Sequence, residues 1–248
     1  MTVKRRNILT GLAAAPFAAL AAGAPAEPPS ACTIDEETSN KLNDWPGLGH
    51  YAAANEAIRI AGRPVDIIFM GDSITQGWPD KRPGFFPRGR VCRGIGGQTT
   101  GQMVLRMMAD VVALKPRLVH IMGGTNDIAG NNGPMTPEQT IHNVEAMVII
   151  AKSNGIKAMI GSVPPAANFP WRPGLETART IADMNLALAR LAEKCGVSFI
   201  DYTPALSDGQ GGMKPGFAYD GVHPDSKGYQ AMESVFEQTI LQPTNRGD

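Results

Sequence analysis

Short apolar runs alternate along the chain with longer segments of helical periodicity, and this alternation restricts the fold more than any other feature. Most of the runs end in Gly, Asp or Pro. They are Val65–Met70, a weak run at Val91–Cys92, Leu118–Met122, Ala158–Val163 and Val197–Ile200. Runs this short, with apolar residues at consecutive positions, are typical of strands that are buried on both faces of a parallel sheet.

The segments between the runs have recognisable helix ends. Thr136 is a predicted N-cap, Gln139 completes a capping box, and apolar residues follow at helical spacing until Gly155. Further helices are expected over residues 176–195 and from about residue 225 onward. Strands and helices that alternate in this way predict an α/β protein, a three-layer α/β/α sandwich with a central parallel sheet of about five strands.

The first 26 residues have the composition of an export signal. Lys4-Arg5-Arg6 precedes an Ala/Leu-rich stretch, which is too short and too rich in Ala and Gly for a stable membrane span. The adjacent arginines resemble a bacterial twin-arginine signal. The alternative is a basic start on a tail with no signal function. We predict a signal peptide at 1–26, a connector at 27–43, one folded domain at 44–242, a tail at 243–248, and a mature protein that is periplasmic or secreted.

The composition excludes several classes of protein. The 248 residues are 43% hydrophobic and 19% charged, with 23 basic and 23 acidic residues. Such a balance gives no reason to expect binding to nucleic acid. The three cysteines, Cys32, Cys92 and Cys195, are too few and too scattered for a disulfide framework or a zinc site. An oxidising compartment would permit one bridge among them, with one thiol left over.

Ser73 is the first candidate for chemistry. It lies in Gly71-Asp72-Ser73-Ile74-Thr75, directly after the first apolar run. Ligands of parallel α/β sheets bind beyond the carboxyl ends of the strands. A serine in a tight turn between a strand and a helix can present its hydroxyl there as a nucleophile. The alternative is that Ser73 only caps the helix.

Two further candidates follow later strands. The glycines of Gly94–Thr100 allow the backbone to approach a ligand and to turn its N–H groups outward. A dinucleotide-binding motif is disfavoured there, because Thr99 occupies the position of its third glycine. Asn126, in Gly123–Asp127, can donate through its amide to an oxygen that becomes negative during acyl transfer. An Asx-type turn is the alternative for that segment.

The last candidate is the pair Asp220 and His223 near the C-terminus. At this spacing a carboxylate can hold one ring nitrogen while the other accepts a proton. A turn with a surface imidazole is the alternative. The other histidines are scattered, and His120 is expected to pack inside a strand. No cluster of potential metal ligands is visible in the sequence.

In this order, the candidates resemble the conserved blocks of the SGNH hydrolase superfamily, the GDSL-type esterases and lipases. Its four blocks fall here on Ser73, Gly97, Asn126 and His223. The resemblance covers roughly residues 44–240 and is closest to a bacterial branch of lysophospholipase- or platelet-activating-factor-acetylhydrolase-like proteins. It implies a flavodoxin-like α/β/α sandwich. Cys92 departs from the pattern, since many relatives carry Asn at this position.

The resemblance implies a role for each residue. Ser73 attacks the ester carbonyl, His223 takes and returns the proton, and Asp220 holds the imidazole. The backbone N–H groups of Ser73 and Gly97 and the side chain of Asn126 form the oxyanion hole. Water then releases the acyl group, and no metal or other cofactor is needed.

The substrate is expected to be a small ester with a short acyl group, acetyl first. The alcohol could belong to a sugar, a lysophospholipid or a simple ester. Two alternatives stay open: acyl transfer to a sugar or to peroxide by the same residues, and a non-catalytic exported glycan-binding module. Any of the aromatic candidates for the pocket walls could instead be a core residue. They are Trp78, Phe85, Phe86, Phe169 and Trp171.

Overall fold

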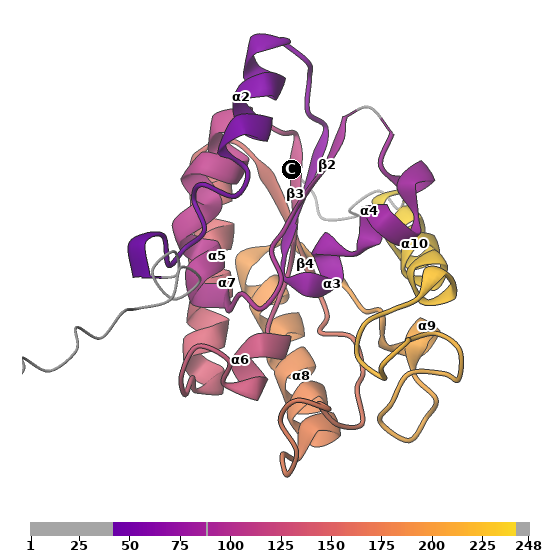
Figure 1. Cartoon of the computed structure of the whole chain (residues 1–248). Helices are drawn as coiled ribbons and strands as arrows, with labels where there is room; N and C mark the ends of the chain where they lie inside the picture. Colours follow the sequence, from indigo (N-terminus) through magenta and orange to yellow (C-terminus); the bar gives the residue numbers. More distant parts are fainter. Residues whose placement is uncertain (1–41, 88, 242–248) are drawn as a thin grey trace, which may run out of the picture. The chain divides into compact units, whose positions relative to one another are not determined.

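The computed structural model describes residues 42–87 and 89–241. Five parallel strands form one sheet in the order β2-β1-β3-β4-β5, with helices on both faces (Figure 1). The predicted signal peptide, most of the connector, Cys32 and the predicted tail lie outside the described residues. The strands are β1 (Ile67–Gly71), β2 (Arg90–Gly94), β3 (Leu118–Met122), β4 (Lys157–Gly161) and β5 (Ser198–Ile200). The predicted α/β/α sandwich is confirmed.

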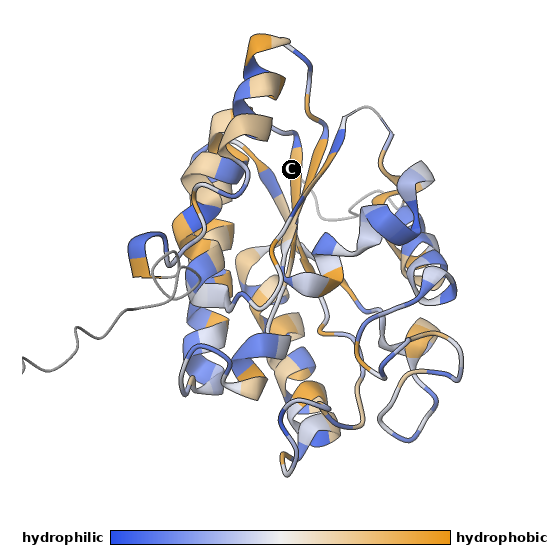
Figure 2. Ribbon diagram, in the orientation of Figure 1, coloured by the Kyte–Doolittle hydropathy of each residue, from blue (hydrophilic) through white to orange (hydrophobic). Residues whose placement is uncertain are grey.

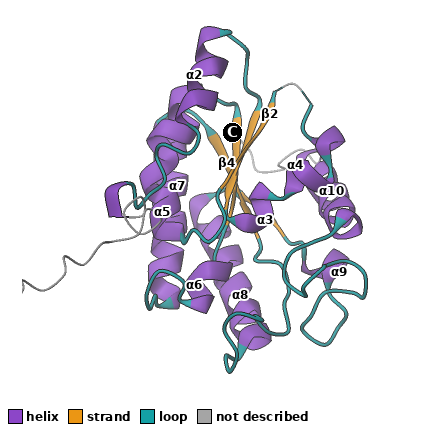
Figure 3. Cartoon of the chain, viewed as in Figure 1, coloured by secondary structure: helices purple, strands orange, loops and turns teal. Residues whose placement is uncertain are grey.

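The helices form two layers, between which the strands run (Figure 3). One layer contains α2 (Ala52–Ile60), α5 (Thr100–Arg106), α7 (Pro137–Ser153) and α8 (Thr177–Cys195). The other contains α4 (Trp78–Lys81), α9 (Thr203–Leu206) and α10 (Ser226–Leu241). Two short helices, α3 (Ser73–Gln76) and α6 (Thr125–Ala129), follow strands β1 and β3 directly. A π-helical turn at Met107–Val111 extends α5, and 3₁₀ turns lie at Pro83–Phe85 and Val112–Leu114.

The core consists of two apolar layers, one on each face of the sheet. Successive strand residues point to opposite faces, so Ile68 packs with the α5, α7 and α8 layer and Phe69 with the α10 layer. The central strand β1 is accordingly apolar and buried along its whole length, whereas β2, at the edge of the sheet, contains Arg90 and Arg93. Figure 2 shows mainly hydrophobic strands with some hydrophilic positions. His120 in β3 is fully buried, with its Nε2 2.9 Å from the Tyr202 hydroxyl, and is a core residue as expected.

The longer helices begin and end where the sequence predicts. At the start of α7, the Thr136 N–H donates to Gln139 Oε1 at 2.8 Å, and the Gln139 N–H donates to Thr136 Oγ1 at 3.2 Å. Gly196 ends α8 in the left-handed region, with φ of 65°. No helix in the described part of the chain is long and apolar enough to cross a membrane.

Glycines at the ends of β1 and β2 allow the turn that follows β1 to pack closely. A Cβ on Gly71 would lie 2.0 Å from Thr75 Oγ1, and one on Gly94 would lie 2.2 Å from the Gln76 nitrogen. Only glycine can occupy such positions. The neighbouring Cys92 thiol donates to the Thr75 carbonyl oxygen at 3.2 Å, so the thiol supplies a hydrogen bond beside this turn. Cys92 and Cys195 are free thiols.

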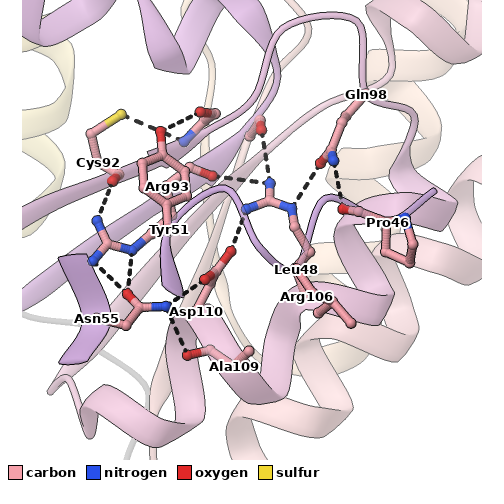
Figure 4. Close-up of polar contacts among 12 residues, drawn as sticks. Pro46, Leu48, Tyr51, Asn55, Cys92, Arg93, Gln98, Arg106, Ala109 and Asp110 are labelled. Carbon is pink, nitrogen blue, oxygen red and sulfur yellow. Dashed lines mark hydrogen bonds and ion pairs between the residues drawn. The ribbon is translucent and has the colours of Figure 1, made fainter. Parts of the chain in front are cut away.

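A buried guanidinium joins the carboxyl ends of β1 and β2 (Figure 4). Arg106 is fully buried and forms an ion pair with Asp110 at 2.6 Å. Its remaining N–H groups donate to Gln98 Oε1 at 2.7 Å, to the Arg93 carbonyl oxygen at 3.1 Å and to the Gly71 carbonyl oxygen at 3.4 Å. Burial lowers the pKa of Arg106, and its pairing with Asp110 opposes that effect.

The same network includes α2 and the segment before it. Asn55 donates to Asp110 Oδ1 at 2.7 Å and accepts from Arg93 Nη2 at 2.6 Å. The Gln98 amide donates to the Pro46 carbonyl oxygen at 2.7 Å. Gln98, in the loop after β2, is therefore held by Arg106 through its side-chain oxygen and by Pro46 through its side-chain nitrogen.

Replacing Arg106 by Met should destabilise the protein by about 3–5 kcal/mol, because Asp110 would stay buried without a cation and with only the Asn55 amide as a donor. The double variant with Asp110→Leu should recover much of this loss, since it removes the unpaired charge as well. Urea denaturation of both variants and of the wild type measures the free energies of unfolding. Equal destabilisation of the single and double variants would show that the ion pair is not the reason.

Candidate active site

The residues predicted to carry chemistry gather at the carboxyl edge of the sheet. Ser73 begins α3 after β1, Gly97 lies in the loop after β2, and Asn126 lies in α6 after β3. His223 lies in the loop that precedes α10. Because all the strands are parallel, their carboxyl ends meet at this one edge.

Ser73, His223 and Asp220 form a continuous chain of hydrogen bonds. Ser73 Oγ lies 2.9 Å from His223 Nε2, and His223 Nδ1 lies 2.7 Å from Asp220 Oδ2. The second carboxylate oxygen of Asp220 accepts from the backbone N–H groups of His223 at 2.7 Å and of Val222 at 3.0 Å. The loop therefore fixes the carboxylate and, through it, the imidazole.

The pKa of Asp220 lies below its usual value. Burial by itself would raise this pKa, but hydrogen bonds from the backbone and ring of His223 and from the backbone of Val222 outweigh that effect. Asp220 is consequently ionised at neutral pH. An ionised carboxylate on Nδ1 favours the ring tautomer whose Nε2 can accept a proton from Ser73.

Asp72, and not Ser73, caps helix α3. Its Oδ1 accepts from the Ile74 N–H at 3.0 Å. The alternative that Ser73 only caps the helix is therefore wrong, and the Ser73 hydroxyl is available to His223. Asp72 is almost fully buried, and burial raises its pKa to about 7, although the Ile74 N–H and the charge of His223 act against this shift.

The loop after β2 and helix α6 are held against each other. Gly97 has a φ of 75°, in the region that favours glycine. The Asn126 amide, which is buried, donates to the carbonyl oxygen of the next residue, Gln98, at 3.0 Å. Asp127 accepts the Thr100 N–H at 3.0 Å and so ties the start of α5 to α6. Gly97 and Asn126 are thus brought to the same side of the site.

The aromatic candidates separate into core and surface residues. Trp78 is fully buried and stacks on Phe85 at 5.0 Å in the α10 layer, so the expectation that it lines the pocket is corrected. Phe169 is also buried and is a core residue, so the expectation that it lines the pocket is corrected as well. Its ring stacks on that of Trp171, with 5.2 Å between the centroids. Trp171 is 41% exposed, and its ring lies 5.9 Å from that of His223.

A cavity of about 210 Å³ opens beside Ser73 and His223. Tyr219, whose ring stacks on His223 at 5.6 Å, forms part of its wall. Sequence reasoning missed Tyr219, since one exposed aromatic in a loop carries no signal. The cavity is lined by Ser73, Gly77, Asp80, Lys81, Tyr219, His223, Pro224 and Tyr229.

Sequence reasoning also missed the residues that support the site from within. Arg106 and Asp110 are charged residues four positions apart in a largely apolar helical segment, and this pattern could have indicated a buried ion pair. Gln98 and Asp127 lie beside predicted site residues, but nothing in the sequence shows which groups they contact. Their roles depend on how the strands are ordered in space.

Comparison with known proteins agrees with the fold and identifies a family. Residues 69–231 match the GDSL-like lipase/acylhydrolase family. A proposed acylhydrolase of Bacteroides fragilis is 39% identical over 79% of this chain and 97% of its own, with a TM-score of 0.73. A GDSL-like lipase of Bacteroides thetaiotaomicron is 37% identical over 79% and 98% of the two chains, with a TM-score of 0.74.

A more distant structure shares the fold. A Streptococcus pneumoniae protein described as a proposed platelet activating factor is 22% identical over 84% of this chain and all of its own, with a TM-score of 0.68. No match was found among curated proteins. The chain belongs to the GDSL-like lipase/acylhydrolase family, as its four sequence blocks predict. It is a carboxylic ester hydrolase.

The Asp72→Asn variant should gain stability relative to the wild type as the pH rises from 5 to 8. A carboxyl with a raised pKa in the folded state keeps its contribution to stability at low pH and loses it as the pH rises through about 7. Asn cannot ionise and has no such loss. Urea denaturation of both proteins at the two pH values measures the difference.

The exposed Asp201, which accepts the Thr203 N–H at the start of α9, offers a matched control. Asp201→Asn removes a carboxylate without removing a buried one, so it should not reproduce the gain. The same difference between Asp72→Asn and the wild type at both pH values would contradict the raised pKa.

Proposed function

We propose that the protein hydrolyses small carboxylic esters with short acyl groups through an acyl-enzyme formed on Ser73. One observation carries this proposal: the unbroken chain from Ser73 through His223 to Asp220, with contacts of 2.9 and 2.7 Å. Nucleophile, base and orienting carboxylate are the parts that acyl transfer through a serine requires.

Each residue has a defined part in the reaction. His223 Nε2 takes the proton from the Ser73 hydroxyl as its oxygen attacks the ester carbonyl. The resulting imidazolium is stabilised by Asp220 and returns the proton to the leaving alcohol. A water molecule, deprotonated in turn by His223, then attacks the acyl-enzyme and releases the acid and free Ser73.

The negative oxygen formed in each step needs hydrogen-bond donors. We assign this role to the backbone N–H groups of Ser73 and Gly97 and to the amide of Asn126. Ser73 is the first residue of α3, where backbone N–H groups have no partner within the helix. Gly97 lies in a turn with positive φ, and Asn126 lies on the same side of the site. Donors fixed in place before the reaction stabilise the developing charge most effectively.

The size and lining of the cavity support a short acyl group such as acetyl. Tyr229 is buried at its wall, and a Cβ added to Gly77 would lie 3.1 Å from the Tyr229 hydroxyl oxygen. A long acyl chain would therefore have to leave the cavity for solvent. The basic and apolar composition of residues 1–26 supports action on such esters after export.

Ser73→Ala and His223→Ala should each abolish nearly as much esterase activity as the two together, with losses on the order of 10³-fold or more. The three groups act as a unit, so removing one disables the others. Hydrolysis of nitrophenyl acetate measures the effect. Ser234→Ala and His142→Ala, on exposed helix faces, are matched controls and should retain wild-type rates. A Ser73→Ala variant with a tenth of wild-type activity would refute the proposal.

Gly77→Ala should lower the ratio of kcat/KM for nitrophenyl butyrate to kcat/KM for nitrophenyl acetate by roughly tenfold, because the butyryl group is longer by two methylene groups and needs the space that the new methyl group takes. The added methyl group narrows the cavity towards Tyr229. Gly84→Ala is a matched control, because a Cβ there meets no atom within 4 Å. An unchanged ratio would show that the acyl group binds elsewhere.

A further inference from the structure

Asn131 contacts Asn126 twice. It follows α6, and its backbone N–H donates to the Asn126 carbonyl oxygen at 3.0 Å. Its side-chain Nδ2 also donates to Asn126 Oδ1. At the other end of the same amide, Asn126 Nδ2 donates to the Gln98 carbonyl oxygen at 3.0 Å and lies 3.4 Å from Asp72 Oδ2. Both ends of the Asn126 amide are therefore occupied.

The orientation of this amide decides whether Asn126 can act as a donor. The oxygen and nitrogen ends of an asparagine side chain are nearly equal in size, but only the nitrogen end carries hydrogens. A rotation by half a turn would present lone pairs to the negative oxygen. Shape alone does not prevent this rotation. The acceptors Gln98 and Asp72 oppose it at the nitrogen end, and a donor to Oδ1 opposes it at the oxygen end. In the described structure Asn131 provides that donor.

Trp171 sets the orientation of Asn131 in turn. Its indole N–H donates to Asn131 Oδ1 at 3.1 Å. An indole nitrogen can only donate, so it selects the Asn131 rotamer whose oxygen faces Trp171 and whose NH₂ group faces Asn126. Trp171 is itself held by its stacking on the buried Phe169, with an angle of 14° between the rings.

We propose that Asn131 and Trp171 are positioning residues that fix the Asn126 amide with its nitrogen towards the reacting oxygen. The direction of donation runs from Trp171 to Asn131 and from Asn131 to Asn126. Trp171 also lies against His223, so the same exposed side chain contacts the base and the support of the amide donor. This inference rests on the proposed function, in which Asn126 stabilises the negative oxygen.

Asn131→Asp is the sharpest test, because it keeps the shape and replaces the donor by an acceptor. The carboxylate would face Asn126 Oδ1 and favour the rotated amide. We expect kcat for nitrophenyl acetate to fall about tenfold, as for the loss of one hydrogen bond in the transition state, with KM little changed. Trp171→Phe, which keeps the ring and removes the N–H, should lower kcat less and should add little to Asn131→Asp.

A double-mutant cycle separates positioning from a general structural role. Asn126→Ala by itself should lower kcat by roughly 10²–10³-fold. In that background Asn131→Asp should change kcat little, because the amide that it positions is gone. A structural role of Asn131 would persist in both backgrounds. Asn154→Asp and Trp45→Phe, at exposed positions away from this chain of contacts, are matched controls and should leave kcat unchanged.

The outcomes distinguish this inference from the proposed function. A wild-type kcat in Asn131→Asp, or an equal loss of kcat in the Asn126→Ala background, would overturn the positioning role. The proposed function would stand in that case, provided that Ser73→Ala is inactive. An active Ser73→Ala variant would overturn the proposed function itself. Circular dichroism and thermal denaturation of each variant identify any loss of folding, and Trp171→Phe provides an independent variant should Asn131→Asp fail to fold.

Discussion

The buried guanidinium of Arg106 joins the elements on which the active site is built. It donates to the carbonyl oxygen that ends β1, to one near the end of β2, and to the side chain of Gln98 in the following loop. Burying a charge costs several kcal/mol, and the close pairing with Asp110 together with the hydrogen bonds to Gln98 and to two backbone carbonyl groups offsets that cost. This side chain consequently ties the end of the strand before Ser73 to the loop of Gly97, alongside the hydrogen bond from the Gly96 N–H to Gln76 Oε1 at 2.8 Å.

The turn itself depends on a division of roles between neighbouring residues. Glycines at the ends of β1 and β2 remove the side chains that would collide with α3. Asp72 caps that helix, and the hydroxyl of Ser73 is thereby directed to His223. The burial of Asp72 raises its pKa, so its ionisation costs folding free energy at neutral pH. The cost arises because Asp72 is almost fully buried at the residue that immediately precedes the nucleophile.

Asn126 is held between the interior and the surface. On the inner side its amide donates to the backbone of Gln98, whose side chain is anchored by Arg106. On the outer side it accepts from Asn131, which Trp171 orients. The inner support is a buried ion network and the outer one is a short chain of partly exposed hydrogen bonds. Changes at Trp171 can therefore alter the site without disturbing the core.

The sequence by itself determined the layers of the fold, the ends of the long helices and the positions of Ser73, Gly97, Asn126 and His223, because local periodicity, caps and strand-end motifs are written in consecutive residues. Only the tertiary structure decided which groups meet. It placed Trp78 in the core and Trp171 beside His223, since burial depends on which helix covers which face of the sheet. It also brought Arg106 to the ends of two strands and Asn131 to Asn126. The side-chain packing and rotamers that create these contacts have no signature in the sequence.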